Sequence, residues 1–233
     1  MRASDRFLPR WEVADVDGAV VVIDVIRAFT TAAYAFGAGA AEIFLVGTVD
    51  EALAFKAATV GSLAMGEDRG RRPVGFDLSN SPVGASIADL DGRTIVQRTS
   101  AGTQGVVAAR SATRLWTASL VCASATAAAL NTSGLGEPTY VITGRFPDRP
   151  DDSGDEDVLA ASFIEGVRRG ELVDPIATAA AVRDTNDARH TVLLGPEHVH
   201  PDDIDYCVRI DHFDFAMEVE RAARGLRLVA CNP

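Results

Sequence analysis

Four short polar segments each follow a largely apolar run, and they contain the residues that could carry out chemistry. The first begins with Asp24, which interrupts the apolar run at 18–25. A charged group is costly in such a place unless it is paired or bound to a metal ion. Arg27 follows within one helical turn and could bind an anion. The alternative for this pair is an N-cap Asp with an Arg nearby, a common arrangement at the start of a helix.

The second segment, 66–82, combines acidic, basic and amide side chains. Glu67 directly follows a short apolar stretch, and its carboxylate suits Mg²⁺, which takes oxygen ligands and keeps several waters. Guanidinium groups can bind phosphate or sulfonate oxygens, and the segment offers Arg69, Arg71 and Arg72. The stretch GFDLSNSP adds three polar candidates, Asp77, Asn80 and Ser81. A solvated loop in which Ser81 caps the next helix is the alternative.

The third segment, 98–103, lies between a predicted strand and a predicted helix. Backbone N–H groups at the start of a helix can bind an anion, and small residues allow it to come close. The candidates for this site are Thr99, Ser100, Gly102 and Thr103. The segment lacks the GxxxxGK[ST] pattern of a Walker loop, and a turn without a ligand is the alternative.

The fourth segment, 153–157, is acidic and contains Glu156 and Asp157. Ser153 and Glu156 have the spacing of a capping box, and acidic residues stabilise a first helical turn, so a helix start would explain the group fully. The HxH pair of His198 and His200 is flanked by Pro on both sides, which favours a surface loop over a metal site. A GxSxG motif and a Cys/His signature are both absent from the sequence.

The composition restricts the possible partners. The net charge of −11 and a pI near 4.8 argue against nucleic acid and against anionic membranes as partners. They leave room for a small phosphorylated ligand, because local Arg residues or a bound cation can reverse the field in one cleft. The three Cys residues are far apart, which is typical of reduced thiols in a cytoplasmic protein. The first 18 residues lack the apolar core of a signal peptide.

Strand and helix patterns alternate along the chain. Apolar runs predict strands at 18–25, 42–47, 62–66, 92–98, 114–120, 139–144, 206–211 and 226–231. Helices are predicted between them, most clearly at 156–170. Thr48 and Glu51 have the spacing of a capping box that would begin the helix after the strand at 42–47. This order predicts an α/β fold with α/β/α layers and a mostly parallel or mixed sheet. We expect one domain over 1–233, in which the acidic stretch at 148–157 could join two lobes near 145–155.

Taken together and in order, the four segments resemble the 2-phosphosulfolactate phosphatase family. That family shows DVLRAxTT, where this chain has DVIRAFTT, and GFDLGNSP, where this chain has GFDLSNSP. It also shows a TTNGT turn, here TSAGT, and a later acidic segment, here GDED. The similarity spans about residues 16–170, and the combination of the first two motifs is specific.

The resemblance implies a Mg²⁺-dependent phosphatase that removes phosphate from 2-phospho-3-sulfolactate, a step of coenzyme M biosynthesis. Among the positions that it carries over, we expect Asp24, Arg27, Asp77 and Glu156 to be catalytic, and Asp24, Glu67, Asp77 and Asp157 to bind the metal, with Glu156 as the alternative to Asp157. Substrate would contact Arg27, Thr30, Asn80, Ser81, Thr99, Ser100, Gly102 and Thr103. A homodimer is possible on general frequency.

Three departures from the family pattern concern the substrate more than the reaction. Ala101 stands where the family often has Asn, Ser100 stands where it often has Thr, and Ser79 replaces Gly. A binding module that kept the fold without the chemistry is the alternative function, and Ala101 is the residue that favours it. A covalent aspartyl phosphate on Asp24 is the alternative mechanism to a metal-assisted attack by water.

Overall fold

The computed structural model describes residues 6–233, and the side chains of all of these except 149–152. A ten-stranded sheet forms its centre, in the order β1-β8-β2-β7-β11-β12-β3-β6-β4-β5. The strands are β1 (Phe7–Pro9), β2 (Ala19–Ile23), β3 (Glu42–Leu45), β4 (Leu63–Gly66), β5 (Leu78–Ser79), β6 (Thr94–Arg98), β7 (Arg114–Ala118), β8 (Thr139–Ile142), β11 (Ala216–Ala222) and β12 (Gly225–Cys231). A separate pair is made by β9 (Arg145–Phe146) and β10 (Arg149–Ser153).

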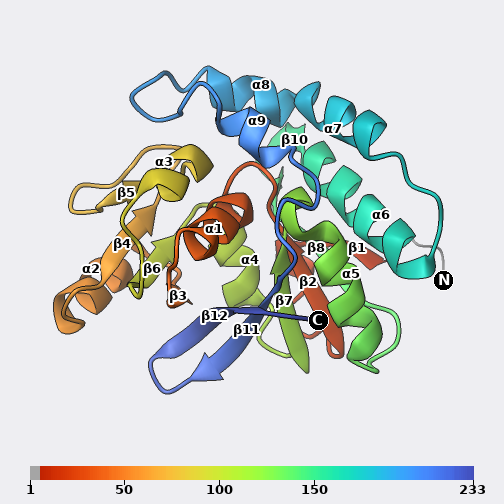
Figure 1. Ribbon diagram of the computed structural model, residues 1–233, viewed down its shortest axis with the longest axis horizontal. Helices are drawn as coiled ribbons and strands as arrows, with labels where there is room; N and C mark the ends of the chain where they lie inside the picture. Colours follow the sequence, from red (N-terminus) through yellow and green to blue (C-terminus); the bar gives the residue numbers. More distant parts are fainter. Residues whose placement is uncertain (1–5) are drawn as a thin grey trace.

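Helices cover the sheet on both faces, which confirms the predicted α/β/α layers (Figure 1). They are α1 (Ala28–Gly37), α2 (Val49–Ala58), α3 (Pro82–Ile87), α4 (Gly102–Ala108), α5 (Ala123–Thr132), α6 (Asp155–Arg169), α7 (Pro175–Arg183), α8 (Asn186–Val192) and α9 (Asp203–Cys207). Alternate residues of β2 face opposite layers, as the strand period of two requires. Val20 and Val22 pack with α1 and α4, whereas Val21 and Ile23 pack with α5 and α6.

The hairpin β11–β12 divides the sheet into two parallel parts that run in opposite directions. Strands β1, β8, β2 and β7 pair in parallel, and so do β3, β6, β4 and β5. Three antiparallel pairings, β7–β11, β11–β12 and β12–β3, lie between these two parts. The sheet is therefore mixed, with parallel pairing on either side of the hairpin, as the sequence predicts.

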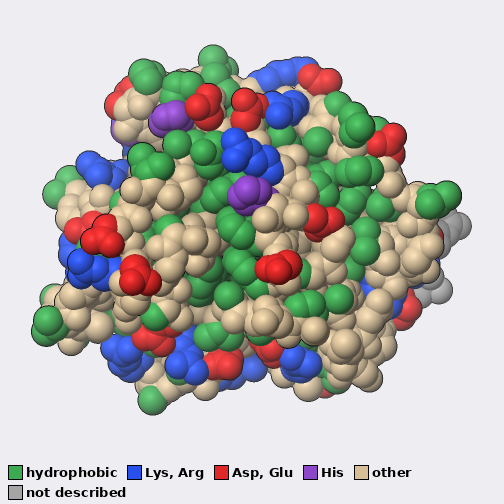
Figure 2. Space-filling model, in the orientation of Figure 1, with side chains coloured by type: hydrophobic (Ala, Val, Ile, Leu, Met, Phe, Trp, Pro, Cys, Tyr) green, Lys and Arg blue, Asp and Glu red, His purple; other side chains and the backbone are tan. Residues whose placement is uncertain are grey.

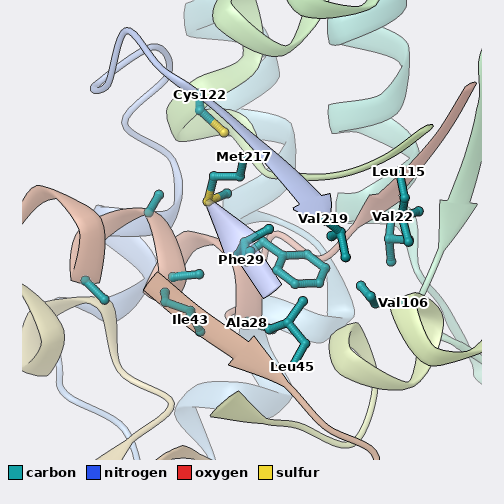
Figure 3. Packing of buried hydrophobic residues seen from close by; sticks show 14 of the residues in the cluster. Val22, Ala28, Phe29, Ile43, Leu45, Val106, Leu115, Cys122, Met217 and Val219 are labelled. Atoms are coloured by element: carbon teal, nitrogen blue, oxygen red, sulfur yellow. The ribbon is translucent and has the colours of Figure 1, made fainter. Parts of the chain in front are cut away.

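Helix α1 fills the space between the two parallel parts. Phe29 of α1 is fully buried in a cluster that includes Val219 of β11 and Leu45 of β3 (Figure 3). The side chain of Gln97, at the end of β6, donates a hydrogen bond of 2.9 Å to the carbonyl of Ala28. Contacts of this kind hold the end of β6 against the end of β2, although the two strands belong to different parts of the sheet.

The helix starts confirm two of the predicted caps and contradict one. Thr48 forms a capping box with Glu51, and Ser81 caps α3, whose first residue is a Pro. The predicted capping box at Ser153 is wrong, because the N-cap of α6 is Gly154 in a left-handed conformation and no side chain caps the helix. Glu156 is therefore not used as a cap.

The prediction of a strand at 206–211 is also wrong. Asp203 begins helix α9, which ends at Cys207, and Cys207 and Val208 pack against the core. The strand that pairs with β12 is β11, at Ala216–Ala222, where charged and apolar residues alternate. Its antiparallel pairing with β12 through a tight turn leaves one face open to charged side chains, a pattern that the search for continuous apolar runs missed.

Helices α7, α8 and α9 lie along one side of the molecule, and the turn of the β11–β12 hairpin lies on the opposite side (Figure 1). Acidic and basic side chains lie next to one another along the edge of the hairpin (Figure 2). That hairpin includes the ion pair between Arg227 and Glu220. Within residues 6–233, every helix is too short or too polar to cross a membrane.

A buried carboxylate ties α6 to β8 and to the start of the described chain. Glu165 accepts hydrogen bonds from the hydroxyl of Tyr140 (2.9 Å) and from the guanidinium groups of Arg6, Arg168 and Arg169. Burial alone would raise the pKa of Glu165, but the bonds from Arg168, Arg6 and Tyr140 outweigh it and hold the pKa at about 2. The charged form of Glu165 therefore stabilises the folded state.

We expect Glu165→Gln to lower the free energy of unfolding by about 2 kcal/mol at pH 7, because three guanidinium groups lose their shared anion. The pKa is lowered in the folded state, so this stabilisation exists above the unfolded pKa of about 4.3 and is lost as the pH falls through about 2. Urea denaturation of both proteins at several pH values between 2.5 and 7 measures the difference. The matched control is Glu137→Gln, which alters an exposed partner of the same Arg residues and should cost under ~1 kcal/mol. An equal loss in both variants would contradict this account.

Candidate active site

One cavity of about 570 Å³ collects the polar residues that follow strands of both parallel parts. Asp24 follows β2 and Thr143 follows β8, while Glu67 follows β4 and Ser100 follows β6. Helices α6 and α8 complete the wall. The lining residues are Asp24, Ile26, Arg27, Glu67, Arg69, Gly70, Asn80, Ser100, Ala101, Thr143, Gly144, Phe146, Glu156, Asp157, Asp187, His190, Thr191 and Leu194.

Asp24 is buried at the start of α1 and has a structural partner there. Its Oδ1 accepts a hydrogen bond of 2.8 Å from the N–H of Ala28, and the hydroxyl of Thr143 lies 3.4 Å from its Oδ2. A Cβ atom on Gly102 would lie 2.7 Å from the same Oδ2, so only glycine lets the β6–α4 turn approach this closely. Asp24 thus accepts from the first N–H of α1 and also lines the cavity, whereas the N-cap position of the helix is occupied by Arg27.

Asp157 is held by backbone amides from the ends of two neighbouring strands. Its Oδ1 accepts from the N–H of Val25 at 3.0 Å, and its Oδ2 accepts from the N–H groups of Thr143 and Gly144 at 3.0 and 2.9 Å. These bonds fix the carboxylate of the first turn of α6 beside the end of β2. A side chain held by three backbone donors has a fixed position before any ligand arrives.

The carboxylates of the cavity repel one another in a buried place. Burial, together with the charge of Glu67, raises the pKa of Asp24 to about 6. Burial and the charge of Asp24 raise the pKa of Asp157 well above its usual range. The same combination, with Asp157 and Asp187 as the charged neighbours, raises the pKa of Glu156. The arrangement favours a bound proton or a bound cation.

Glu156 is the carboxylate that most clearly requires a proton or a cation beside it. The residue is 3% exposed, and its Oε2 accepts no hydrogen bond from any donor among the residues that the structure describes. Its hydrogen-bonding neighbour is the carboxyl group of Asp187 in α8. Two carboxyl groups can share such a contact only when a proton or a cation lies between them.

Glu67 is held by the turn that follows β6. Its carboxylate accepts hydrogen bonds from the N–H and the hydroxyl of Ser100 and from the N–H of Gly70. Gly66, directly before it, has a φ of +136°, and a Cβ atom there would lie 1.9 Å from the carbonyl oxygen of Arg98. Glycine is therefore required where β4 passes β6 and delivers Glu67 to the cavity.

Basic and apolar groups line the remainder of the cavity. Arg27, Arg69 and His190 contribute nitrogen donors, and Ile26, Phe146 and Leu194 contribute apolar surface. Arg27 is 4% exposed and forms an ion pair of 2.7 Å with Asp203. Cationic groups facing buried carboxylates suit an anion that binds together with a cation.

The structure brings some of the predicted residues together and separates others from them. Those that line the cavity are Asp24, Arg27, Glu67, Asn80, Ser100, Glu156 and Asp157. Those outside the lining are Thr30, Asp77, Ser81, Thr99, Gly102 and Thr103. Of the three Arg residues considered in the second segment, Arg69 lines the cavity.

Asp77 is the clearest correction, because it was expected to bind metal beside Asp24. Its Oδ1 pairs with the ammonium group of Lys56 at 2.7 Å, and its Oδ2 accepts from the N–H of Ala64 at 2.8 Å. Burial would raise the pKa of Asp77, but its hydrogen bonds, first that from Lys56, keep the pKa below the usual value. Asp77 fastens its loop to α2 and β4 instead of facing the cavity.

The hydroxyl groups expected to contact substrate serve the turns themselves. Thr30 donates to the carbonyl of Val25 at 2.7 Å, and Thr99 and Thr103 bond to each other's backbone. Ser81 caps α3 and donates to Asp203 at 2.6 Å. These residues shape the loops that present Ser100 and Asn80 to the cavity.

Several lining residues were not predicted from the sequence. Thr143 and Gly144 end the predicted strand at 139–144 and follow β8, which ends at Ile142. The rule that selected Asp24, at the end of another predicted strand, could also have selected them. Asp187 and His190 lie in α8, a short helix without a motif, and the sequence offers no signal that it returns to this cavity.

The donor atoms fit a hard cation such as Mg²⁺, with water completing its ligands. Within residues 6–233, no group of three or more acidic, His or Cys side chains is arranged to hold an ion by itself. Mg²⁺ commonly binds through one or two carboxylates and retains water. The buried carboxylates Asp24 and Asp157, each next to the other's charge, meet that requirement.

The fold and the cavity define an α/β protein in which buried carboxylates and the side chains of Arg27 and Arg69 line one cavity. The sequence model of the family described as 2-phosphosulpholactate phosphatase matches residues 8–222, and the chain belongs to this family. This membership supports phosphatase activity.

The relatives include "Probable 2-phosphosulfolactate phosphatase" of Bacillus subtilis (strain 168), 32% identical over 208 residues, which are 86% of each chain. The protein of the same name in Thermoplasma acidophilum is 29% identical over 198 residues, covering 85% of this chain and 84% of its own. That of Carboxydothermus hydrogenoformans is 43% identical over 111 residues, 48% of this chain and 46% of its own.

We expect Glu156→Gln to stabilise the metal-free protein by about 1 to 2 kcal/mol at pH 8, because an amide can donate to the carboxyl group of Asp187. The raised pKa of Glu156 means that the folded chain holds an additional proton above the unfolded pKa. The wild-type free energy of unfolding therefore falls as the pH rises, and the advantage of the variant should vanish near pH 4. Urea denaturation with a chelator, at pH 4 and pH 8, measures this.

The control for that experiment is Glu12→Gln, which neutralises an exposed carboxylate and should change little at either pH. A Glu156→Gln protein that is less stable than wild type at pH 8 would contradict the repulsion described here.

Proposed function

We propose that this chain is a Mg²⁺-dependent phosphatase that hydrolyses the phosphomonoester of a small anionic hydroxy acid, with 2-phospho-3-sulfolactate as the substrate that the family suggests. The products are 3-sulfolactate and inorganic phosphate, and water supplies the oxygen. The observation that carries the proposal is the cluster of buried carboxylates facing Arg27 and Arg69 in one cavity. Family membership supports the same reaction.

Asp24 and Asp157 would hold Mg²⁺, and Glu67 would add negative charge nearby. The bound cation would neutralise charge on these carboxylates and on the phosphoryl oxygens. Asp157 is suited to this task because three backbone N–H groups already fix its position. Asp24 is similarly fixed by the N–H of Ala28.

Arg27 and Arg69 would bind the anionic groups of the substrate through their N–H groups. Ser100 lines the cavity at the start of the β6–α4 turn, where its N–H and hydroxyl hold the carboxylate of Glu67. The Oδ1 atom of Asn80 is buried and lacks a hydrogen-bond partner among the residues described, so it can accept from a hydroxyl group of a ligand. Ile26, Phe146 and Leu194 exclude water from one side of the cavity.

Glu156 is the group best suited to move a proton. It shares a contact with Asp187 that requires a proton when no cation is present. A proton held at its Oε2 can pass to the ester oxygen as the bond to phosphorus breaks, which balances the leaving alkoxide. Attack by water is the route proposed here, and a covalent phosphoryl group on Asp24 would be the competing route.

We expect Asp24→Asn to lower kcat/KM at least about 100-fold with 2-phospho-3-sulfolactate and Mg²⁺, because it removes a charge that the cation needs. Asp77→Asn is the matched control: it changes an acidic residue of the same kind that lies outside the cavity, and its activity should stay within about threefold of wild type. Release of inorganic phosphate measures both, with circular dichroism to confirm folding.

Chelation should abolish the wild-type activity, and added Mg²⁺ should restore it. If the wild-type protein binds phospho-hydroxy acids in a calorimeter but never releases phosphate, the chain is a binding module and the proposed reaction is wrong. If Asp24→Asn and Asp77→Asn lose activity equally, the assignment of the cavity as the active site is wrong.

A further inference from the structure

Asp203 is a fully buried carboxylate directly behind the cavity. It accepts hydrogen bonds from Arg27 Nη1 at 2.7 Å, from the hydroxyl of Ser81 at 2.6 Å and from the N–H of His200 at 3.0 Å. The N–H of Val83 lies 3.4 Å from the same Oδ1 that accepts from Ser81. These donors come from three segments that are far apart in the sequence.

The position of Asp203 joins the two loops that carry candidate substrate-binding residues. Arg27 lies in the turn between β2 and α1, and Ser81 follows Asn80 in the loop before α3. The carboxylate of Asp203, supplied by α9, is the group that bonds to both. Since Arg27 and Asn80 line the cavity and Asp203 does not, its influence on a ligand must pass through them.

The ion pair fixes one side of the Arg27 guanidinium. Within residues 6–233, the hydrogen bonds that the structure gives Arg27 use Nη1, one to Asp203 and one of 3.2 Å to the carbonyl of His198. Nε and Nη2 make no hydrogen bond with the described residues, and Arg27 lines the cavity, so these are its N–H groups that remain for a ligand there. Because the guanidinium is planar and rigid, holding Nη1 also sets the direction of the other donors.

Stability alone explains this arrangement poorly. A buried ion pair costs desolvation energy on both sides and is often no more stabilising than apolar residues of the same volume. Such a pair is useful where a charged group must be held in one orientation. Arg27 is 4% exposed, so the orientation of its guanidinium in the cavity depends on the buried partner that binds Nη1.

We propose that Asp203 is a positioning residue of this site, which orients Arg27 and the Asn80 loop toward the anionic part of the substrate. This inference rests on the proposed function for its substrate. The kind of ligand whose binding it controls is a phosphate or another oxyanion, because that is what the free edge of a guanidinium recognises.

The test compares Asp203→Asn, Arg27→Lys and the double variant in the full-length protein. Asp203→Asn keeps the size of the side chain and removes its charge. We expect it to raise KM about 10-fold and to change kcat by no more than about threefold. The reason is that the guanidinium of Arg27 is no longer oriented toward the substrate, whereas the residues that would hold the cation are unchanged. Arg27→Lys should raise KM by a similar factor, and the double variant should be no worse than Arg27→Lys alone, since both act through the same guanidinium.

Glu165→Gln is the matched control. It also removes a buried carboxylate that accepts from Arg side chains, but it lies outside the cavity lining. It should lower stability and leave KM unchanged, so a purely structural role of Asp203 would give the same pattern as this control. The proposal would be overturned if Asp203→Asn left KM unchanged or lowered it. It would also be overturned if the increases in KM of the two single variants added together in the double variant.

A second variant and a binding measurement test the role of Asp203 if the first variant does not fold or the protein shows no activity. If Asp203→Asn does not fold, Ser81→Ala removes one donor to Asp203 and should raise KM about threefold, whereas no change in KM would count against the proposal. If the wild-type protein hydrolyses no phosphoester, the proposed function has failed. Asp203 is then tested by the dissociation constant of inorganic phosphate in calorimetry, which Asp203→Asn should raise about 10-fold if the wild type binds phosphate. An unchanged constant, or no binding of phosphate by the wild type, would refute the positioning role.

Discussion

Repulsion between buried carboxylates is the constraint on which the rest of this structure depends. Asp24, Glu156 and Asp157 are each almost fully buried, and each lies within the field of another carboxyl group. Such a group of charges is stable only with backbone donors, protons or a cation beside it. Backbone amides donate hydrogen bonds to Asp24 and Asp157. Among the described residues, the Oε2 atom of Glu156 has no such donor. The shortage of donors in an otherwise well-packed molecule suits a ligand that carries positive charge.

The fold serves this cluster through close approaches of its loops. The two parallel parts of the sheet run in opposite directions, yet their turns meet because α1 packs between them and the β6–α4 turn touches the start of α1. Gly66 and Gly102 are needed where backbone passes too near for a side chain. Asp203 lies behind the same junction and bonds to both the Arg27 turn and the Asn80 loop. The position of the site is therefore set by contacts between loops, and the strands provide their starting points.

The strands and helices were predictable from the sequence to the extent that their signals are local. The apolar run of β2 and the cap at Thr48 depend on a few neighbouring residues, and both were predicted. The strand β11 was missed because it alternates charged and apolar residues on a half-exposed hairpin. The apolar residues around Cys207 predict a strand, but the chain forms helix α9 there, and Asp203 in its first turn bonds to the distant Arg27.

The candidate site shows the same division. Asp24, Glu67 and Asp157 were selected because polar residues after apolar runs come to the ends of strands, and they do line one cavity. Asp77 satisfies the same rule, but Lys56, which is 21 positions earlier in the chain, holds it elsewhere. Asp187 reaches Glu156 from α8 through tertiary packing that leaves no pattern in the sequence. The sequence therefore predicts which residue types could carry out chemistry, but it does not predict their tertiary partners.

The claim that this carboxylate cluster is a cation site is tested most directly by crystallography with Mn²⁺ in place of Mg²⁺. Anomalous scattering then shows where the metal lies in a protein that also hydrolyses its substrate with Mn²⁺. The account predicts a single strong peak within coordination distance of the carboxylates of Asp24 and Asp157. An active protein whose crystals show no peak in the cavity at saturating Mn²⁺, or a peak beside other residues, would contradict it.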